Sequence, residues 1–171
     1  NSSDIKMNFV TNHDENSWNG TIKERMGNAS SLMTTLVYTI PGMPLIYSGQ
    51  EYDLDYQLKF FEKDSIPKTK GVTWNLLEKL GALKNNNTAL NGGKNAANYS
   101  ILHTNNENVL AFNKSKNDAS LYFIGNLSKE AQTFTLDLEG SFTDVLTAEK
   151  IVLNTEKIEL QPWEYYLIQN K

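Results

Sequence analysis

The sequence predicts an α/β segment of two βα units followed by an all-β, antiparallel β-sandwich. Residues 7–84 alternate short apolar runs with helical stripes, which is typical of parallel strands joined by helices. An asparagine- and glycine-rich joint at residues 85–98 interrupts this pattern. Beyond the joint, turn signals recur about every 8–12 residues without a helical stripe, as in sandwiches. We therefore expect two domains, at residues 1–90 and residues 91–171.

The α/β segment opens with an apolar run at Met7–Val10 that is long enough for one strand. A helix is predicted at Asn28–Ile40, because apolar side chains recur there at helical spacing and Pro41-Gly42 follows as a stop signal. Met43–Tyr47 is the next continuously apolar strand. Since a helix separates the two short strands, we expect them to be parallel.

Two more helices are predicted before the joint. Thr73–Lys84 carries leucines on one face, and the mixed pattern of Leu58–Asp64 fits one short helix. After the joint, apolar and polar side chains alternate, as in strands with one buried face, and we expect residues 98–171 to fold without the rest. The expected strands are Tyr99–Thr104, Val109–Asn113, Leu121–Gly125, Thr133–Leu138, Phe142–Leu146, Lys157–Leu160 and Trp163–Ile168.

Composition narrows the range of partners. The 171 residues include no cysteine and carry a net charge of -4. Disulfides and thiolate metal sites are thereby excluded, and the acidic balance argues against nucleic acid as a partner. No apolar run approaches the roughly 18 residues of a membrane span, so no membrane partner is expected. No cluster of His, Asp and Glu has metal-ligand spacing, so we predict no metal and no cofactor, and the compartment stays open.

The candidate site directly follows the first predicted strand, where Asn12, His13, Asp14 and Glu15 stand in a row. Ligands bind at the carboxyl ends of strands in parallel sheets and in barrels. An imidazole and a carboxylate at this edge are therefore candidates for catalysis or binding. A second interpretation stays open, because an aspartate followed by Ser, Asn and Gly is also typical of a turn that bonds its own backbone.

The hexapeptide Phe-Val-Thr-Asn-His-Asp at residues 9–14 resembles the fourth conserved region of the α-amylase family, glycoside hydrolase family 13. Four further segments resemble parts of that family in the same order: residues 24–27, 41–51, 58–64 and 161–166. The resemblance covers the whole chain. It implies the last two βα units of a (β/α)₈ TIM barrel, followed by the family's carboxyl-terminal β-domain, as a fragment of a longer enzyme.

The resemblance also implies site roles. The family cleaves α-1,4-linked glucans such as starch or maltooligosaccharides with retention, which needs a nucleophilic carboxylate and an acid roughly 5 Å apart. A third carboxylate of the family, the transition-state stabiliser, is matched here by Asp14. His13 matches an imidazole that hydrogen-bonds sugar hydroxyls, and Asn12 is expected to bind substrate beside it. Trp18 either stacks on a sugar face or packs the loop, and both interpretations stay open.

The family's nucleophile and general acid lie on the fourth and fifth barrel strands, whereas this chain begins at what resembles the seventh. We therefore expect the 171-residue chain alone to be inactive. The other carboxylates of the segment are expected to be structural or solvated: Glu24, Glu51, Asp53 and Asp55.

Two alternatives to a hydrolase fragment stay open: a transglycosylase or α-glucosidase of the same family, and a non-catalytic carbohydrate-binding or scaffold piece. An α-glucan is the expected ligand in each case. Because a quarter of a barrel cannot close, we also expect self-association or retained pieces of the parent barrel. Such cover would shield strand edges at Met7 and Pro44, side chains such as Phe9, Leu45 and Tyr47, and a helical stripe at Leu32, Leu36 and Ile40.

Overall fold

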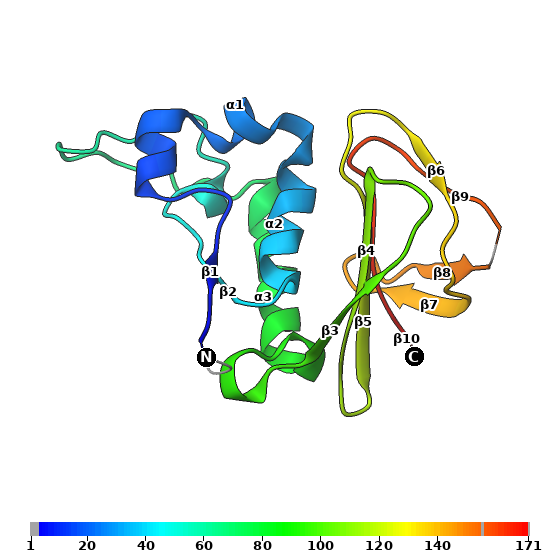
Figure 1. The fold of residues 1–171 in the computed structure, drawn as a ribbon. Coiled ribbons are helices and arrows are strands. Elements are labelled where there is room, and N and C mark those ends of the chain that lie inside the picture. The colour runs from blue at the N-terminus through cyan, green and yellow to red at the C-terminus, as the bar shows by residue number, and fades with distance from the viewer. Residues whose placement is uncertain (1–3, 155, 171) are drawn as a thin grey trace.

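The computed structural model describes residues 4–154 and 156–170. Its elements lie in successive layers in Figure 1: a two-stranded pair, two helices, a six-stranded sheet and a second two-stranded pair. The first two layers are the pair β1 (Met7–Asn8) and β2 (Met43–Pro44), and the helices α2 (Ser30–Thr39) and α3 (Val72–Asn86). The last pair consists of β6 (Gln132–Phe134) and β9 (Ile158–Leu160).

Strands β1 and β2 pair in parallel, with Met7 opposite Met43, so the predicted parallel pairing is confirmed. Both strands are shorter than predicted, since neither Met7–Val10 nor Met43–Tyr47 continues beyond its second residue as a strand. The chain bends at Val10, whose side chain turns into the core beside the helices. The pairing of β1 with β2 therefore ends just before the chain turns and buries Val10 against the helices.

Three short helical segments connect β1 to α2: η1 (Glu15–Asn19, a π-helix), α1 (Ile22–Met26) and η2 (Gly27–Ala29). Helix α2 lies within the predicted Asn28–Ile40, and α3 extends the predicted Thr73–Lys84 by a few residues. Two 3₁₀ turns, η4 (Thr88–Leu90) and η5 (Gly93–Asn95), occupy the joint.

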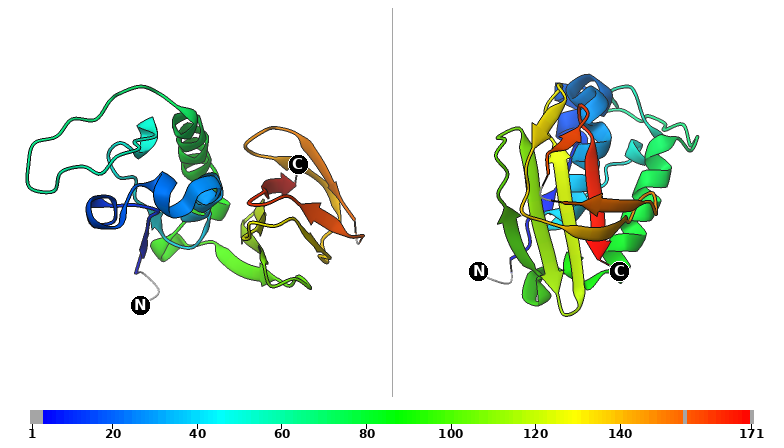
Figure 2. Two further views of the ribbon diagram at one scale, coloured as in Figure 1. Left: turned by 90° about the horizontal axis from the view of Figure 1, so that it is seen from above. Right: turned by 90° about the vertical axis from the view of Figure 1, so that its right-hand side faces the viewer.

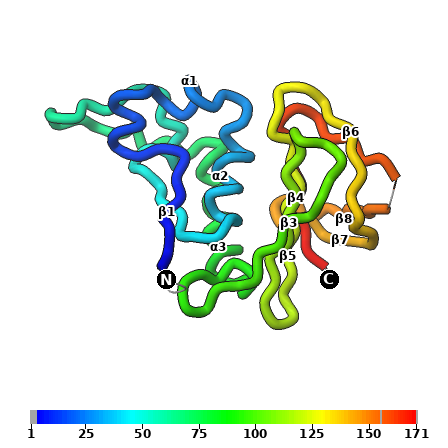
Figure 3. The backbone as a smooth tube through the Cα atoms, viewed as in Figure 1, coloured from blue at the N-terminus to red at the C-terminus, as the bar shows by residue number. Residues whose placement is uncertain are grey.

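The helix predicted at Leu58–Asp64 is wrong. After η3 (Gln50–Tyr52), residues 53–71 form an irregular loop that projects away from the helices in Figures 2 and 3. Within the predicted helix, backbone N–H groups donate to side-chain oxygens and not to the carbonyl oxygens of a helical turn. Leu58 N donates to Asn16 Oδ1 over 2.8 Å, and Lys59 N donates to Asp64 Oδ2 over 3.1 Å.

The predicted antiparallel β-domain is confirmed, with one strand more than expected. The six-stranded sheet has the order β3-β4-β5-β10-β7-β8, and β6 pairs with β9 separately. The unpredicted strand is β8, which pairs with β7. The strands of the sheet are β3 (Asn98–Leu102), β4 (Val109–Lys116), β5 (Ala119–Asn126), β7 (Gly140–Asp144), β8 (Lys150–Leu153) and β10 (Tyr165–Asn170).

Both faces of the large sheet are buried. One face contributes Phe112, Leu121, Phe123 and Leu167 to a core shared with Leu32 and other residues of the helices. The opposite face packs against β6 and β9 in a second core, which includes Val109, Ile124, Phe134, Leu160 and Ile168. We predicted from the sequence that residues 98–171 fold alone. That prediction did not include the core that these residues share with the helices.

The shared core also corrects the prediction for the α2 stripe. Leu32 is fully buried, and Leu36 and Ile40 pack against the same cluster, because the sheet covers the side of α2 that we expected to be open. Among the side chains that we expected to face a barrel interior, Phe9 is exposed as predicted, whereas Leu45 and Tyr47 are half-buried.

A row of aromatic rings lines the sheet face that meets the helices. Tyr99, Phe112, Phe123 and Tyr165 come from four neighbouring strands, with ring centroids 5.1, 5.1 and 5.9 Å apart along the row. Thr35 Oγ1 of α2 donates to the Tyr165 hydroxyl over 3.0 Å. The row therefore joins sheet and helix, and burial raises the pKa of Tyr165.

Candidate functional site

His13 and Asp14 lie at the start of a helical turn, a few residues after β1, and their side chains are exposed. Their side chains are 63% and 60% exposed, and His13 Nε2 lies 3.5 Å from Asp14 Oδ1. In the described residues, the Asp14 carboxylate makes no hydrogen bond to backbone. Instead, Asn12 Oδ1 accepts from Glu15 N over 2.8 Å and stabilises the start of the turn. The turn-forming role that the sequence left open for Asp14 thus belongs to Asn12.

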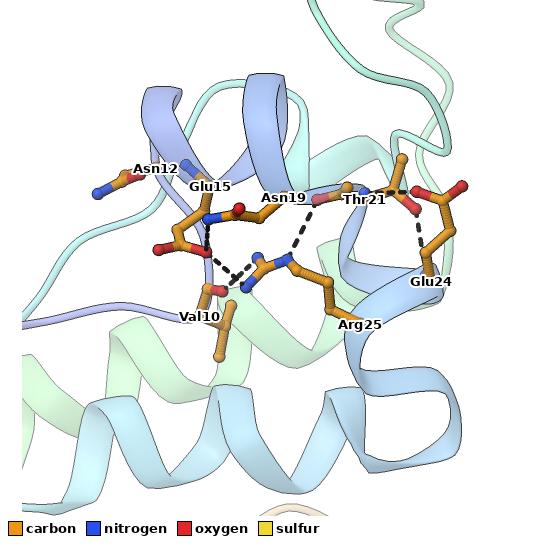
Figure 4. Close-up of polar contacts among 8 residues, drawn as sticks. Val10, Asn12, Glu15, Asn19, Thr21, Glu24 and Arg25 are labelled. Carbon is orange, nitrogen blue, oxygen red and sulfur yellow. Dashed lines mark hydrogen bonds and ion pairs between the residues drawn. The ribbon is translucent and has the colours of Figure 1, made fainter.

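Arg25 braces the turn from below, as Figure 4 shows. Its guanidinium donates to Val10 O over 2.8 Å and to Gly20 O over 3.1 Å, and it pairs with Glu15 Oε2 at 3.1 Å. Asn19 Nδ2 donates to the same Glu15 oxygen over 3.2 Å. These contacts tie both ends of residues 10–20 to helix α1.

A capping box fixes the helix that carries Arg25. Glu24 N donates to Thr21 Oγ1 over 3.2 Å, and Thr21 N donates to Glu24 Oε2 over 2.8 Å. The Thr-x-x-Glu spacing was visible in the sequence, and it marks a helix start. The bracing role of Arg25 was missed, because nothing in its local pattern says which carbonyl groups it reaches.

An aromatic patch, defined here as His13, Trp18, Phe60 and Phe61, lies beside Asp14. The ring centroids of Phe60 and Trp18 are 5.3 Å apart, those of Phe60 and His13 5.8 Å, and those of Phe60 and Phe61 4.8 Å. Trp18 and Phe61 are 60% and 86% exposed. The patch presents ring faces next to polar groups, an arrangement that suits the apolar faces and hydroxyl edges of sugars.

Asn16 holds the loop that brings Phe60 and Phe61 to this patch. Its buried amide accepts from Leu58 N over 2.8 Å and donates to Tyr56 O over 3.2 Å. Ser17 Oγ adds a bond to Leu58 O over 3.0 Å. Sequence reasoning missed Phe60 and Phe61 as site residues, because their position depends on this contact between segments about 40 residues apart.

Asp53 and Asp55, expected to be solvated, and Glu51, expected to be structural, each have a partner within the protein. Asp55 pairs with Lys23 at 2.6 Å, and this hydrogen bond raises the pKa of Lys23. Asp53 Oδ1 accepts from Thr73 N over 3.2 Å, and Glu51 Oε2 accepts from Gly49 N over 2.8 Å.

Two wider searches cover only the described part of the chain. Among residues 4–154 and 156–170, no group of three or more His, Cys, Asp or Glu side chains could hold a metal ion. In the same residues, none of the helices is long and apolar enough to cross a membrane.

Residues 99–167, which cover β4, β5 and most of the other strands, match the sequence profile of the family described as Maltogenic Amylase, C-terminal domain. The resemblance of the chain to the carboxyl-terminal portion of α-amylase-family proteins is thereby confirmed. No curated protein sequence matches the chain.

Solved structures with the same fold include α-amylases from three bacteria. A maltogenic α-amylase from Thermotoga neapolitana is 21% identical with a TM-score of 0.79, and the likeness covers 97% of this chain and 41% of that one. An α-amylase from Lactobacillus plantarum is 20% identical with a TM-score of 0.72, covering 98% and 38%. One from Geobacillus thermoleovorans, solved with acarbose, is 15% identical with a TM-score of 0.71, covering 96% and 38%. The chain thus spans about two fifths of these amylases.

Proposed function

We propose that the chain is the carboxyl-terminal part of a retaining α-glucan hydrolase of the α-amylase type. In this proposal residues 1–90 supply the last two βα units of a (β/α)₈ barrel, and residues 91–171 are its β-sandwich domain. The parallel pairing of β1 and β2 across helix α2 supports the first assignment. The family match of residues 99–167 and the amylases of the same fold support the second.

Within that enzyme, Asp14 is proposed to stabilise the oxocarbenium-like transition state, and His13 to hydrogen-bond sugar hydroxyls at the cleaved unit. The observation that carries this assignment is the exposed His13–Asp14 pair on a turn braced by Arg25, at the edge of the aromatic patch. Trp18 is proposed to stack on a sugar ring. Asn12 uses its Oδ1 to form the turn, so its contribution to substrate binding falls to its Nδ2 group.

The 171-residue chain is proposed to bind α-glucan without hydrolysing it. Retaining cleavage needs two further carboxyl groups about 5 Å apart on either side of the scissile bond. The carboxylates near Asp14 are engaged elsewhere, for example Glu15 with Arg25 and Asp55 with Lys23. A binding or scaffold role of the chain by itself is the second candidate, and the exposed rings of Trp18 and Phe61 favour it.

The test uses Asp14→Asn in the complete parent enzyme. We expect kcat on maltooligosaccharides to fall by orders of magnitude with the fold unchanged, because the carboxylate charge is lost where positive charge develops. Asp118→Asn, an exposed change in the β4–β5 turn, is the matched control and should leave kcat unaltered. A near-normal kcat for Asp14→Asn would remove this residue from the catalytic set. Product analysis on the same substrates separates hydrolysis from transglycosylation or α-glucosidase action.

A further inference from the structure

Phe60 and Phe61 lie at the tip of the loop formed by residues 53–71, which projects from the helices in Figure 2. The Phe61 side chain is 86% exposed, more than any other large apolar side chain of the described residues, and Phe60 is 41% exposed. Single exposed apolar side chains are ordinary, whereas apolar groups gathered in one exposed patch mark a binding surface. The two rings belong to such a patch and therefore need an explanation.

Hydrogen bonds close the tip that carries the two rings. The Asp64 carboxylate accepts from Lys59 N over 3.1 Å and from Ser65 N over 2.8 Å. The Tyr56 hydroxyl donates to Ser65 O and ties the two limbs of the loop together. Because these bonds already order the tip in the free protein, a ligand that binds the rings loses less affinity to the ordering of the loop.

Phe60 connects the rings of the aromatic patch with one another. Its ring centroid lies 5.8 Å from that of His13, 5.3 Å from that of Trp18 and 4.8 Å from that of Phe61. The patch therefore extends from the His13–Asp14 pair through Phe60 to Phe61. A chain-like ligand with one unit at the pair would reach the two phenylalanine rings with its following units.

The planes of these rings are inclined to one another, so together they present a curved surface. The interplanar angle is 34° for His13 and Phe60, 44° for Trp18 and Phe60, and 70° for Phe60 and Phe61. A flat, ribbon-like chain such as a β-1,4-linked glucan stacks best on coplanar rings. In an α-1,4-linked glucan each sugar ring is turned relative to the preceding one, so successive apolar faces meet rings of different inclination. The curved surface therefore favours the α-linked chain.

We propose that Phe60 and Phe61 determine specificity: they stack on the glucosyl units next to the one at His13 and select longer α-1,4-linked chains over maltose and over β-1,4-linked chains. Aromatic rings supply the apolar contact in such a site, and a few polar groups fix the orientation of the ligand. Lys59 and Glu62, which pair at 2.9 Å and flank the two rings in the sequence, offer such groups to sugar hydroxyls. The choice of a glucan as ligand rests on the proposed function, whereas the curvature of the ring surface does not.

The experiment titrates the ¹⁵N-labelled 171-residue chain with maltose, maltotriose, maltotetraose and maltohexaose in NMR spectra. It follows the indole N–H resonance of Trp18 and the backbone amides of residues 59–64, at a protein concentration at which light scattering shows a constant mass. We expect saturable shifts and an affinity that rises with chain length. Cellotetraose should bind about tenfold more weakly than maltotetraose, a difference of roughly 1.4 kcal/mol.

Variants of Phe61 separate stacking on the ring from simple apolar contact. Phe61→Leu keeps an apolar side chain and removes the ring, so maltohexaose should bind about two- to tenfold more weakly, the range of one lost aromatic contact, while maltose binding stays the same. Phe61→Trp keeps a ring face and should retain the gain with chain length. Val152→Ala on β8, where the side chain is 73% exposed, is the matched control and should change neither affinity.

The outcome is independent of the test of the catalytic role. A near-normal kcat of Asp14→Asn in the parent enzyme would refute that role, whereas a gain in affinity with chain length that Phe61→Leu removes would still support the specificity role. Equal affinities for maltose and maltohexaose, equal affinities for cellotetraose and maltotetraose, or wild-type binding in Phe61→Leu would overturn the proposal. A Phe61→Leu variant that loses stability or self-association but keeps its glucan binding would identify the rings as a protein-packing surface and would overturn it as well.

Discussion

Arg25 shows how one side chain positions a candidate site that it does not enter. Its three donor groups reach the carbonyl of Val10, the carboxylate of Glu15 and the carbonyl of Gly20. A planar guanidinium satisfies such separated acceptors at once, and an ammonium group does not. The turn that carries His13 and Asp14 is therefore held by geometry as well as by charge.

Arg25→Lys keeps the charge and loses this geometry. We expect the amides of residues 12–19 to exchange faster with solvent, by the equivalent of about 1.5–3 kcal/mol for a lost charged hydrogen bond. Hydrogen exchange followed by mass spectrometry measures this directly. Glu15→Gln, which retains the shape of the acceptor, should have a smaller effect. Equal protection in the wild type and in Arg25→Lys would show that the bracing is not needed.

Lys114 is a second residue whose environment has a measurable consequence. It lies on β4 with a fully buried side chain, and burial together with the charge of Lys84 lowers its pKa to about 8. Burial also lowers the pKa of Lys84, which donates to Leu90 O over 2.8 Å. The charged form of Lys114 is thus destabilised in the folded protein at neutral pH.

The pH dependence follows from this shift. An unfolded lysine keeps its proton up to about pH 10.4, so between pH 8 and 10 the unfolded state binds more protons than the folded state. The free energy of unfolding should therefore rise from pH 7 to pH 9.5, by about 1–3 kcal/mol. Lys114→Met should be more stable than the wild type at pH 7 and should show a flatter profile in urea denaturation. A wild-type stability that falls over this interval would contradict the expectation.

At the scale of elements, the loop at residues 53–71 has no regular structure and yet is placed over η1. Asn16 and Ser17 hold its backbone at Tyr56 and Leu58. The aromatic patch therefore depends on two hydrogen-bonded anchors and on the ring contacts themselves. Such a segment opens more easily than the sheet, because most of its side chains are exposed.

Asn16→Ala should release this loop. The loss of two hydrogen bonds, worth about 1 kcal/mol each, should raise the population of the open loop by tenfold or more. Limited trypsin digestion should then cut faster after Lys59 and Lys63, with little change in the thermal transition of the whole chain. Asn19→Ala, an exposed change on the same π-helix, should leave the cleavage rate nearly unaltered. Equal rates for the two variants would remove Asn16 as the anchor.

At the scale of the molecule, the large sheet joins the two parts of the chain. Phe112, Phe123, Tyr165 and Leu167 of this sheet share a core with α2 and α3, so removing the helices would expose several large side chains. Burying each of them is worth about 1.5–3 kcal/mol, and the sum is comparable with the stability of a small domain. Residues 98–171 should therefore be far less stable alone than in the chain.

The opposite side of the molecule carries an exposed edge patch, defined as Ile5, Met7, Phe9 and Met43, which are 51%, 53%, 41% and 50% exposed. It lies along β1 and β2, which pair only with each other among the described strands. We expect the 171-residue chain to self-associate through this patch or to retain pieces of its parent barrel. Exposed apolar surface and an unpaired strand edge both favour association with another polypeptide that covers them. Light scattering together with a denaturing gel tests this.

The double substitution Phe9→Asp and Met43→Lys should shift such an association toward monomer by placing charges on the patch. Exposed changes on β8, such as Val152→Lys, serve as the control and should not affect it. A wild-type chain that stays monomeric at high concentration without additional peptide would refute the expectation.

The sequence by itself determined helices α2 and α3, the parallel pairing of β1 with β2, most of the antiparallel strands and the resemblance carried by Asn12, His13 and Asp14. These features are local, since periodicity, stop signals and short motifs each lie within about a dozen residues. Only the tertiary structure decided which surface covers which. The sheet whose core includes Leu32 and the anchors that bring Phe60 to Trp18 both join segments far apart in the chain. An apolar stripe specifies that a face is buried, and packing in three dimensions selects its partner.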